Sequence, residues 1–287
     1  MRTVAIVATG PQVLVQDLGR PGFAHLGVPP SGALDVPALR LANRLVGNAE
    51  SLAGLEILLG GLRLRAESSC VVAVTGPSTS VTVDGRQRGT HAPVHLSIGD
   101  ELTLAQPVDG LRNYLAVNGG IAVGTELGSR STDVLSGIGP APVRAGDVLP
   151  LGEPAGFAAG ADELAASAMP AELTLPVLLG PREDWFDVPA TQLRAGTWRV
   201  SPESNRIGLR LTGPALRRAK QYAGSELPSE PVVTGAVQVP ANGRPVVFLA
   251  DHPTTGGYPV VGVVPAGELA ALAQVRPGTV VRLLPVV

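Results

Sequence analysis

A polar loop that follows an apolar run is the part of this sequence richest in groups able to do chemistry. The segment DHPTTGGYPVVG, residues 251–262, comes directly after PVVFLA. Its two glycines allow positive φ and a close approach of the backbone to another group, while the neighbouring Asp, Thr and Tyr residues supply carboxylate and hydroxyl groups. The same residue types dominate ordinary turns. Local chemistry therefore leaves two interpretations open, a ligand-facing loop and a strand-to-strand turn.

Signatures of the common catalytic and metal sites are missing from the sequence. There is no Gly-x-Ser-x-Gly, His-Glu-x-x-His, Cys-x-x-Cys or strand-to-helix Gly-x-Gly-x-x-Gly. His91 and His95 are four residues apart, but Pro93 lies between them, so helical metal-ligand spacing does not apply. We therefore expect no metal site.

Lysine chemistry rests on one residue, since Lys220 is the only lysine among the 22 basic residues. It lies in RRAKQYAG, which is not the Gly-Lys-Ser/Thr of a P-loop. The surroundings of Lys220 also lack the exposed turn between strands that a biotin-carrier lysine needs. We expect no covalent biotin on this chain.

Composition narrows the class of protein further. A net charge of −2 and 3% aromatic residues do not suit a nucleic-acid surface. One cysteine, Cys70, excludes an intrachain disulfide framework and fits a reducing cytoplasm. No apolar stretch reaches the roughly 18 residues of a membrane span, and the start, MRTVAIVATG, is too short for a signal segment. We expect a cytoplasmic protein that acts on a small molecule.

Short apolar runs punctuated by Gly and Pro dominate the chain. Examples are CVVAVTGP, VTVDGR, NYLAVNGG, RIGLRLTGP, PVVFLAD and TVVRLLP. Runs of this length with regular turn signals indicate β-strands of barrels or sandwiches rather than βαβ units. The fold class predicted is mostly β.

Few helices are expected. One begins near Asp35, which can cap the first turn, and ends at Gly47; a second, short one spans Gly267 to Val275. The Ala-rich segment 152–172 has no strand alternation and is predicted to link two domains, 1–155 and 170–287. Strand exchange between the domains stays open as an alternative, and it would make these contiguous boundaries too simple.

Four longer motifs, taken in order, resemble the allophanate hydrolase subunit 2 family, which includes the KipI antagonist, the 5-oxoprolinase C subunit and the carboxyltransferase domain of urea amidolyases. They are QDLGRPGFAHLGVPPSGALDVPALRLANRLVGN, YLAVNGGIAVGTELGSRSTDVLSGIG, SPESNRIGLRL and SEPVVTGAVQVPANGRPVVFLADHPTTGGYPVVG. The resemblance spans most of the chain and implies two cyclophilin-like β-barrels with few short helices.

The resemblance also implies an activity and partners. The activity is that of an ATP-dependent amidohydrolase subunit, which opens 5-oxoproline to glutamate in complex with a subunit 1 or KipI-like protein and, in the bacterial 5-oxoprolinase type, a third subunit. ATP would bind on this chain or mainly on a partner. Two alternatives stay open: a carboxyltransferase or allophanate-hydrolase-type module of urea metabolism, and a non-catalytic regulatory antagonist of a kinase inhibitor.

Candidate site residues follow from the same motifs. Asp251 or Glu230 is the general base expected if this subunit supplies one. The candidates for substrate binding are Arg20, Asp35, Arg130, Gln238, Thr254, Thr255, Gly256, Gly257 and Tyr258. Asp35 has an alternative interpretation as a helix N-cap, and either arginine could instead hold loop carbonyls.

The sequence departs from the family pattern at one place. Relatives often carry a basic residue directly after Gly-Gly-Tyr-Pro, where this sequence has Val260, and His252-Pro253 replaces a more polar pair. A carboxyltransferase must hold anionic carboxyl groups together, so the missing cation weakens that alternative more than the lactam-opening one.

Overall fold

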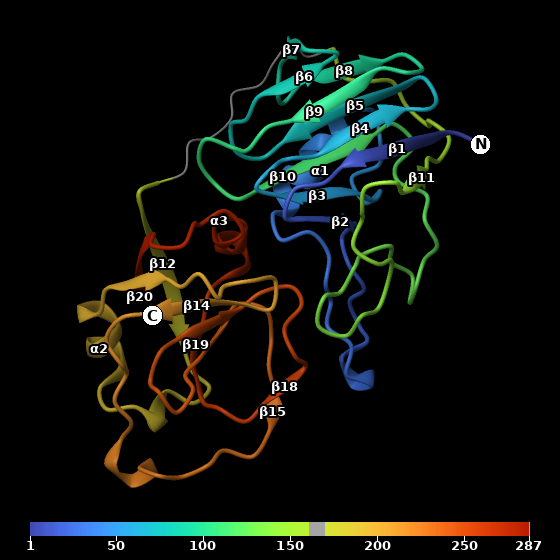
Figure 1. Ribbon diagram of the computed structural model, residues 1–287. Coiled ribbons are helices and arrows are strands. Elements are labelled where there is room, and N and C mark those ends of the chain that lie inside the picture. The colour runs from blue at the N-terminus through green and yellow to red at the C-terminus, as the bar shows by residue number, and fades with distance from the viewer. Residues whose placement is uncertain (161–169, 287) are drawn as a thin grey trace. The chain divides into compact units, whose positions relative to one another are not determined.

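The chain divides into two compact units in the structure, a computed structural model that describes residues 1–160 and 170–286 (Figure 1). Of these residues, the first unit holds 1–20, 31–133 and 137–160, and the second holds 21–30, 134–136 and the chain from Pro170 on. Two short segments of the predicted N-terminal domain therefore belong to the second unit. The predicted linker, 152–172, includes residues 161–169, which lie outside the described part of the chain.

The first unit contains two antiparallel sheets. One has the strand order β11-β1-β4-β9-β6-β7, formed by β1 (Thr3–Ala8), β4 (Arg63–Ala66), β6 (Val81–Val83), β7 (Arg86–Arg88), β9 (Glu101–Leu104) and β11 (Val148–Pro150). The other has the order β2-β3-β10-β5-β8, formed by β2 (Gln12–Gln16), β3 (Gly54–Leu58), β5 (Cys70–Thr75), β8 (Pro93–Leu96) and β10 (Arg112–Val117). Apolar side chains of both sheets, such as Leu64 and Leu115, join one buried core.

Helix α1 (Val36–Leu45) covers part of the five-stranded sheet. It begins as the sequence predicts, because the Asp35 side chain accepts a hydrogen bond from the backbone N–H of Ala38 at 3.0 Å. Its stripe of Ala42 and Leu45 packs with Ala73 of β5 and Ala116 of β10. The predicted helix is confirmed.

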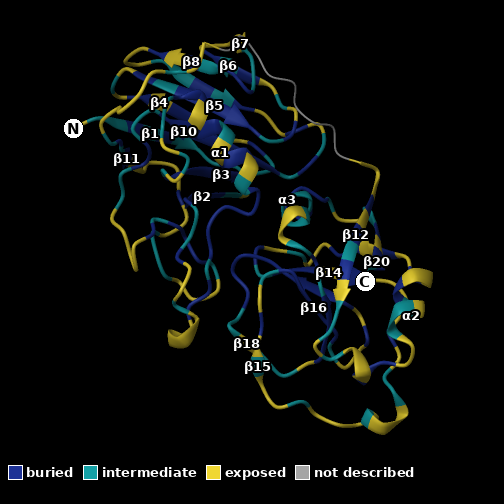
Figure 2. Cartoon of the chain, turned by 180° about the vertical axis from the view of Figure 1, so that it is seen from behind, coloured by how far each residue is buried: buried dark blue, intermediate teal, exposed yellow. Residues whose placement is uncertain are grey.

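The second unit is built around a closed seven-stranded barrel. Its order is β12-β19-β16-β17-β14-β13-β20, with β12 (Glu172–Leu179), β13 (Trp198–Val200), β14 (Gly208–Thr212), β16 (Ala236–Gln238), β17 (Val246–Phe248), β19 (Val260–Val263) and β20 (Val280–Val286). Strands β12 and β20 close it as a parallel pair. Alternate residues of these strands are buried, and Leu175 and Leu283 are at most 1% exposed. Figure 2 shows the buried strands and the exposed connecting segments.

The second unit also contains short elements outside the barrel. They are β15 (Glu230–Pro231) paired with β18 (Thr255–Gly256), helices α2 (Pro189–Ala195) and α3 (Leu269–Leu272), and the 3₁₀ turns η1 (Ala24–Leu26), η2 (Glu183–Trp185), η3 (Lys220–Tyr222) and η4 (Ala266–Glu268). Turn η4 and helix α3 together span Ala266–Leu272, so the helix predicted over Gly267 to Val275 ends three residues earlier than predicted. Helix α2 was not predicted, because its seven residues bury one large side chain, Leu193, and leave no periodic stripe to detect.

The mostly β fold class is confirmed by these strands and by the closed barrel. Among the described residues, none of the helices has the length and apolar character that crossing a bilayer would require.

Candidate functional site

The loop that follows β17 folds back along the segment that contains β15. Thr255 and Gly256 form β18 and pair with Glu230 and Pro231. The carbonyl of Thr254 accepts a hydrogen bond from the Val232 backbone N–H at 3.0 Å. These bonds fix the first half of the loop, so its second half, Gly257 and Tyr258, projects beyond the paired segment.

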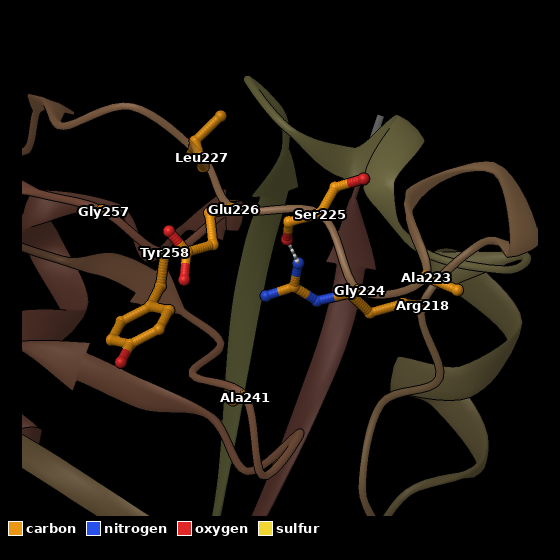
Figure 3. A pocket seen from close by; sticks show the side chains of 9 residues that line it. All are labelled: Arg218, Ala223, Gly224, Ser225, Glu226, Leu227, Ala241, Gly257 and Tyr258. Atoms are coloured by element: carbon orange, nitrogen blue, oxygen red, sulfur yellow. Dashed lines mark hydrogen bonds between the residues drawn. The ribbon is translucent and has the colours of Figure 1, made fainter.

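Gly257 and Tyr258 line a cavity of about 750 Å³ in the second unit (Figure 3). The other walls come from Arg218, from the segment 223–227 and from Ala241. A cavity of this size is typical of small-molecule sites. Of the five loop residues predicted to bind substrate, these two border the cavity, whereas Thr254, Thr255 and Gly256 serve the pairing behind it.

Arg218 supplies the positive charge of the cavity. Its guanidinium lies 5.2 Å from the centroid of the Trp185 ring, and that ring stacks on Tyr222 with centroids 4.4 Å apart. Its Nη1 donates to the carbonyl of Ser225 at 3.2 Å. The contact with the ring and one hydrogen bond hold the guanidinium in place, and in the described part of the chain its other N–H groups have no partner.

Glu226 and Tyr258 supply an acceptor and an aromatic surface. Figure 3 shows the Glu226 carboxylate and the Arg218 guanidinium reaching the same cavity from different parts of the 218–227 segment. Within residues 1–160 and 170–286, the Glu226 carboxylate has no hydrogen-bond or ion-pair partner. A cation, an unengaged carboxylate and a ring around one space suit a small polar molecule that carries both a carboxylate and an N–H donor.

Glu230 lies beside the loop but is held by Arg182. The Arg182 Nε donates to Glu230 Oε2 at 3.0 Å, and a second bond joins Nη2 to Oε1. These hydrogen bonds lower the pKa of Glu230 below its usual value. A carboxylate stabilised in its ionised form in this way is a weaker base than a free one.

Asp251 is completely buried at the start of the loop. Its Oδ2 and Oδ1 accept hydrogen bonds from Arg206 Nε and Nη2 at 2.8 and 2.9 Å. Oδ2 also accepts from the backbone N–H of Val134 at 3.1 Å. This carboxylate does not line the cavity, and its oxygens hold the protein together. Its role as a general base stays a prediction.

Gln238 supports the loop from the barrel wall. It is buried on β16, and its Nε2 donates to the carbonyl of Tyr258 at 3.2 Å. A Cβ at Gly256 would lie 2.4 Å from that same Nε2. A side chain at Gly256 would therefore push the Gln238 amide out of its present position.

The predicted site residues Arg20, Asp35 and Arg130 all lie in the first unit. Arg20 donates through Nε to the carbonyl of Glu126 at 3.3 Å and through Nη2 to that of Ser131. Arg130 donates through Nε to the carbonyl of Val123 at 2.7 Å. Both arginines thus hold loop carbonyls, and Asp35 caps α1. Their roles in substrate binding stay predictions.

Asp17, which directly follows β2, forms hydrogen bonds with the loop that contains Arg130. Its carboxylate accepts from the backbone N–H groups of Gly19 and Arg130 and from the hydroxyls of Ser129 and Ser131, at 2.6 to 2.8 Å. Arg20 Nη1 is buried without a hydrogen-bond partner in the described structure.

Sequence reasoning missed Arg218 and Glu226. They lie in residues 212–228, between the motifs SPESNRIGLRL and SEPVVTGAVQVP. Lys220 is the one residue of this segment that the sequence motifs bring into question as a functional group. A usable signal was an arginine pair followed within ten residues by Gly-Ser-Glu in a stretch without strand alternation. In the described part of the chain, no three His, Cys, Asp or Glu side chains are grouped to hold a metal ion.

The chain belongs to a known class of protein. The family model described as carboxyltransferase domain, subdomain A and B, matches residues 26–285. The chain therefore belongs to this family, in agreement with the resemblance of its four motifs.

Individual relatives point to two activities. The chain is 38% identical over 280 residues to the 5-oxoprolinase C subunit of Escherichia coli, covering 95% of this chain and 88% of that protein. It is 31% identical to the urea amidolyase of Saccharomyces cerevisiae, covering 98% of this chain but only 16% of that protein. The crystal structure of the K. lactis urea amidolyase superimposes with a TM-score of 0.90 at 31% identity, and the chain spans 19% of it.

Proposed function

We propose that this chain is a subunit of an ATP-dependent 5-oxoprolinase complex, which opens 5-oxoproline to glutamate. The observation that carries the proposal is the cavity in which Arg218, Glu226 and Tyr258 meet. The 38% identity to the 5-oxoprolinase C subunit over most of both chains supports the choice of substrate.

The groups of the cavity match those of 5-oxoproline. This substrate carries a carboxylate, a lactam N–H and a small ring with an apolar edge. Arg218 binds the carboxylate through its free N–H groups, and Glu226 accepts the lactam N–H. The ring of Tyr258, which is 46% exposed, packs against the substrate ring. Together these contacts orient the lactam carbonyl and exclude part of the solvent around it.

Opening the lactam requires activation of its carbonyl. ATP supplies this by transferring its γ-phosphate to the carbonyl oxygen and leaving as ADP. One water then adds to the carbon, and the C–N bond breaks to give a free amine and an acyl phosphate. A second water hydrolyses the acyl phosphate to the carboxylate and phosphate. We assign substrate positioning to this chain, and nucleotide binding and the general base to the complex that it forms with a subunit 1 or KipI-like protein and a third subunit. Asp251 is buried and Glu230 is ion-paired, which favours a base on a partner.

The test is glutamate release from 5-oxoproline and ATP by this chain co-expressed with its partner subunits. Release should stop when the chain is left out. Arg218→Gln and Glu226→Gln should each raise KM by about 10- to 100-fold with little change in kcat, as expected for lost ground-state contacts. Arg217→Gln is the matched control, because Arg217 is the exposed neighbour and does not line the cavity.

An intact complex that releases no glutamate would overturn the proposed function. If the complex is active and both cavity variants have an unchanged KM, the substrate does not bind in this cavity. The proposed activity would then stand, with its substrate site elsewhere.

A second candidate function is a carboxyltransferase module of urea metabolism. It is favoured by the alignment of urea amidolyase relatives along 98% of this chain. A biotin carrier would then belong to another chain or domain. Turnover that depends on bicarbonate and a biotinylated partner, without 5-oxoproline, would select this candidate.

A further inference from the structure

A second, smaller cavity of about 180 Å³ lies in the second unit beside the loop between β16 and β17. Pro240 of that loop lines this cavity, and the next residue, Ala241, lines the larger one. The same loop therefore borders both cavities, although the two cavities share no lining residue.

Two arginines of the small cavity sit close together on the outer surface of the barrel. Arg210 of β14 is paired with Val246 of β17, and Arg244 precedes Val246 by two residues. The ladder continues there, because the Leu211 N–H donates to the Pro245 carbonyl at 3.0 Å. Since side chains alternate along a strand, Arg244 and Arg210 face the same side as diagonal neighbours.

Neither guanidinium is engaged by the protein. Over residues 1–160 and 170–286, the side chains of Arg210 and Arg244 make no hydrogen bond or ion pair, and both residues are exposed. Two adjacent like charges without compensation disfavour the folded state by mutual repulsion. An anion between them would remove that repulsion.

Further donors point into the same space from fixed turns. Ser201 Oγ accepts from the backbone N–H of Glu203 at 3.2 Å, which leaves the hydroxyl proton for a ligand. Asn242 Oδ1 accepts from the backbone N–H of Arg244 at 3.0 Å, which leaves the Nδ2 group for a ligand. Local hydrogen bonds thus orient both side chains as donors.

One carboxylate, that of Glu203, lines the cavity among these donors. The carboxylate of Glu203 forms no ion pair with either arginine in the described structure. A fully deprotonated anion such as sulfate would be repelled by this group. An anion that retains an O–H can instead donate to the carboxylate while its other oxygens accept from the arginines. Phosphate keeps such a proton at neutral pH, and sulfate does not.

We propose that the cavity of Arg210, Arg244 and Glu203 binds a phosphoryl group that carries an O–H, of which inorganic phosphate is the simplest example. The ligand is either free phosphate or the terminal phosphate of a nucleotide. This inference does not rest on the proposed function, since the residues that carry it do not line the larger cavity.

The experiment is calorimetric titration of the full chain with phosphate, with sulfate and with ADP at neutral pH and constant ionic strength. Phosphate should bind, and sulfate should bind at least about tenfold more weakly. Arg210→Gln and Arg244→Gln should each weaken phosphate binding about tenfold or more. Glu203→Gln turns the acceptor into an amide and should narrow the gap between phosphate and sulfate. Arg86→Gln, an exposed arginine of β7 in the first unit, should change nothing.

Three results would overturn the proposal. They are no phosphate binding, equal binding of phosphate and sulfate, and phosphate binding that survives both arginine substitutions. Comparison with ADP identifies the source of the ligand. If ADP binds more tightly than phosphate and Arg210→Gln weakens its binding, the ligand is a nucleotide. If ADP binds more weakly than phosphate, the ligand is free phosphate.

Discussion

Asp251 and Arg206 form a buried, two-bonded ion pair in the second unit, with Nε–Oδ2 and Nη2–Oδ1 distances of 2.8 and 2.9 Å. The two side chains are 0% and 1% exposed. The pair joins the start of the 251–258 loop to the turn before β14, and the Val134 N–H adds a third bond to the carboxylate. The carboxylate of Asp251 therefore connects three separate segments of the second unit.

Breaking this pair should destabilise the protein strongly. Asp251→Asn removes a carboxylate charge that the buried Arg206 guanidinium pairs with, and we expect a loss of about 3–5 kcal/mol in the free energy of unfolding. Urea denaturation of the purified chain measures it. The control is Asp187→Asn, whose partner Arg217 lies at 3.5 Å in an exposed pair that should be worth less than about 1 kcal/mol. Unchanged stability with loss of turnover would return Asp251 to the list of catalytic candidates.

Asp35 should behave as a helix cap. Asp35→Asn retains a side-chain oxygen for the Ala38 N–H, whereas Asp35→Ala removes it and should cost about 0.5–2 kcal/mol. Thermal or urea unfolding of the two variants separates them. If the Asn variant unfolds normally but the complex that contains it fails to bind substrate, the carboxylate itself is needed and the cap is not its whole role.

Gly256 and Gln238 should be energetically coupled. A methyl group at Gly256 would displace the end of the flexible Gln238 side chain and disturb its bond to the Tyr258 carbonyl, so Gly256→Ala should cost about 0.5–1.5 kcal/mol, the worth of one hydrogen bond. In a Gln238→Ala background the same change should cost much less. A double-mutant cycle of unfolding free energies measures the difference. Equal costs in both backgrounds would show that the strain comes from the backbone instead.

The Cys70 thiol should be unreactive in the native protein. Burial raises its pKa from 9.0 to about 11, so the nucleophilic thiolate is scarce at pH 8. A thiol reagent such as DTNB should label it rapidly only after unfolding in guanidinium. Fast labelling of native protein at pH 8 would contradict this.

The same pKa shift gives a pH dependence with a definite sign. Between pH 9 and 11 the unfolded chain releases the Cys70 proton while the folded one retains it, so stability falls as pH rises through this window. Below pH 9 the contribution is fully present. Cys70→Ala should flatten the slope of unfolding free energy against pH between 9 and 11, and an unchanged slope would assign that dependence to other groups.

Local sequence signals determined much of the fold. Short Val- and Leu-rich runs bounded by Gly and Pro predict strands because their side chains alternate between core and solvent, as β12 does. Asp35 and Pro37 predict the start of α1 because capping is a property of neighbouring residues. The family also follows from the sequence, since its motifs are contiguous. Helix α2 was not predicted, because seven residues with one buried side chain show too little hydrophobic periodicity.

The site needed the tertiary structure. Whether Asp251 is a base or a framework residue depends on Arg206, which lies 45 positions away and faces it only after the barrel closes. Residues 21–30 and 134–136 join the second unit for the same reason, that contacts between distant segments leave no local pattern. The sequence indicated the loop that contains Gly257 and Tyr258, because its residues carry polar groups and glycines. Its cavity with Arg218 and Glu226 exists only because folding brings separate segments around one space.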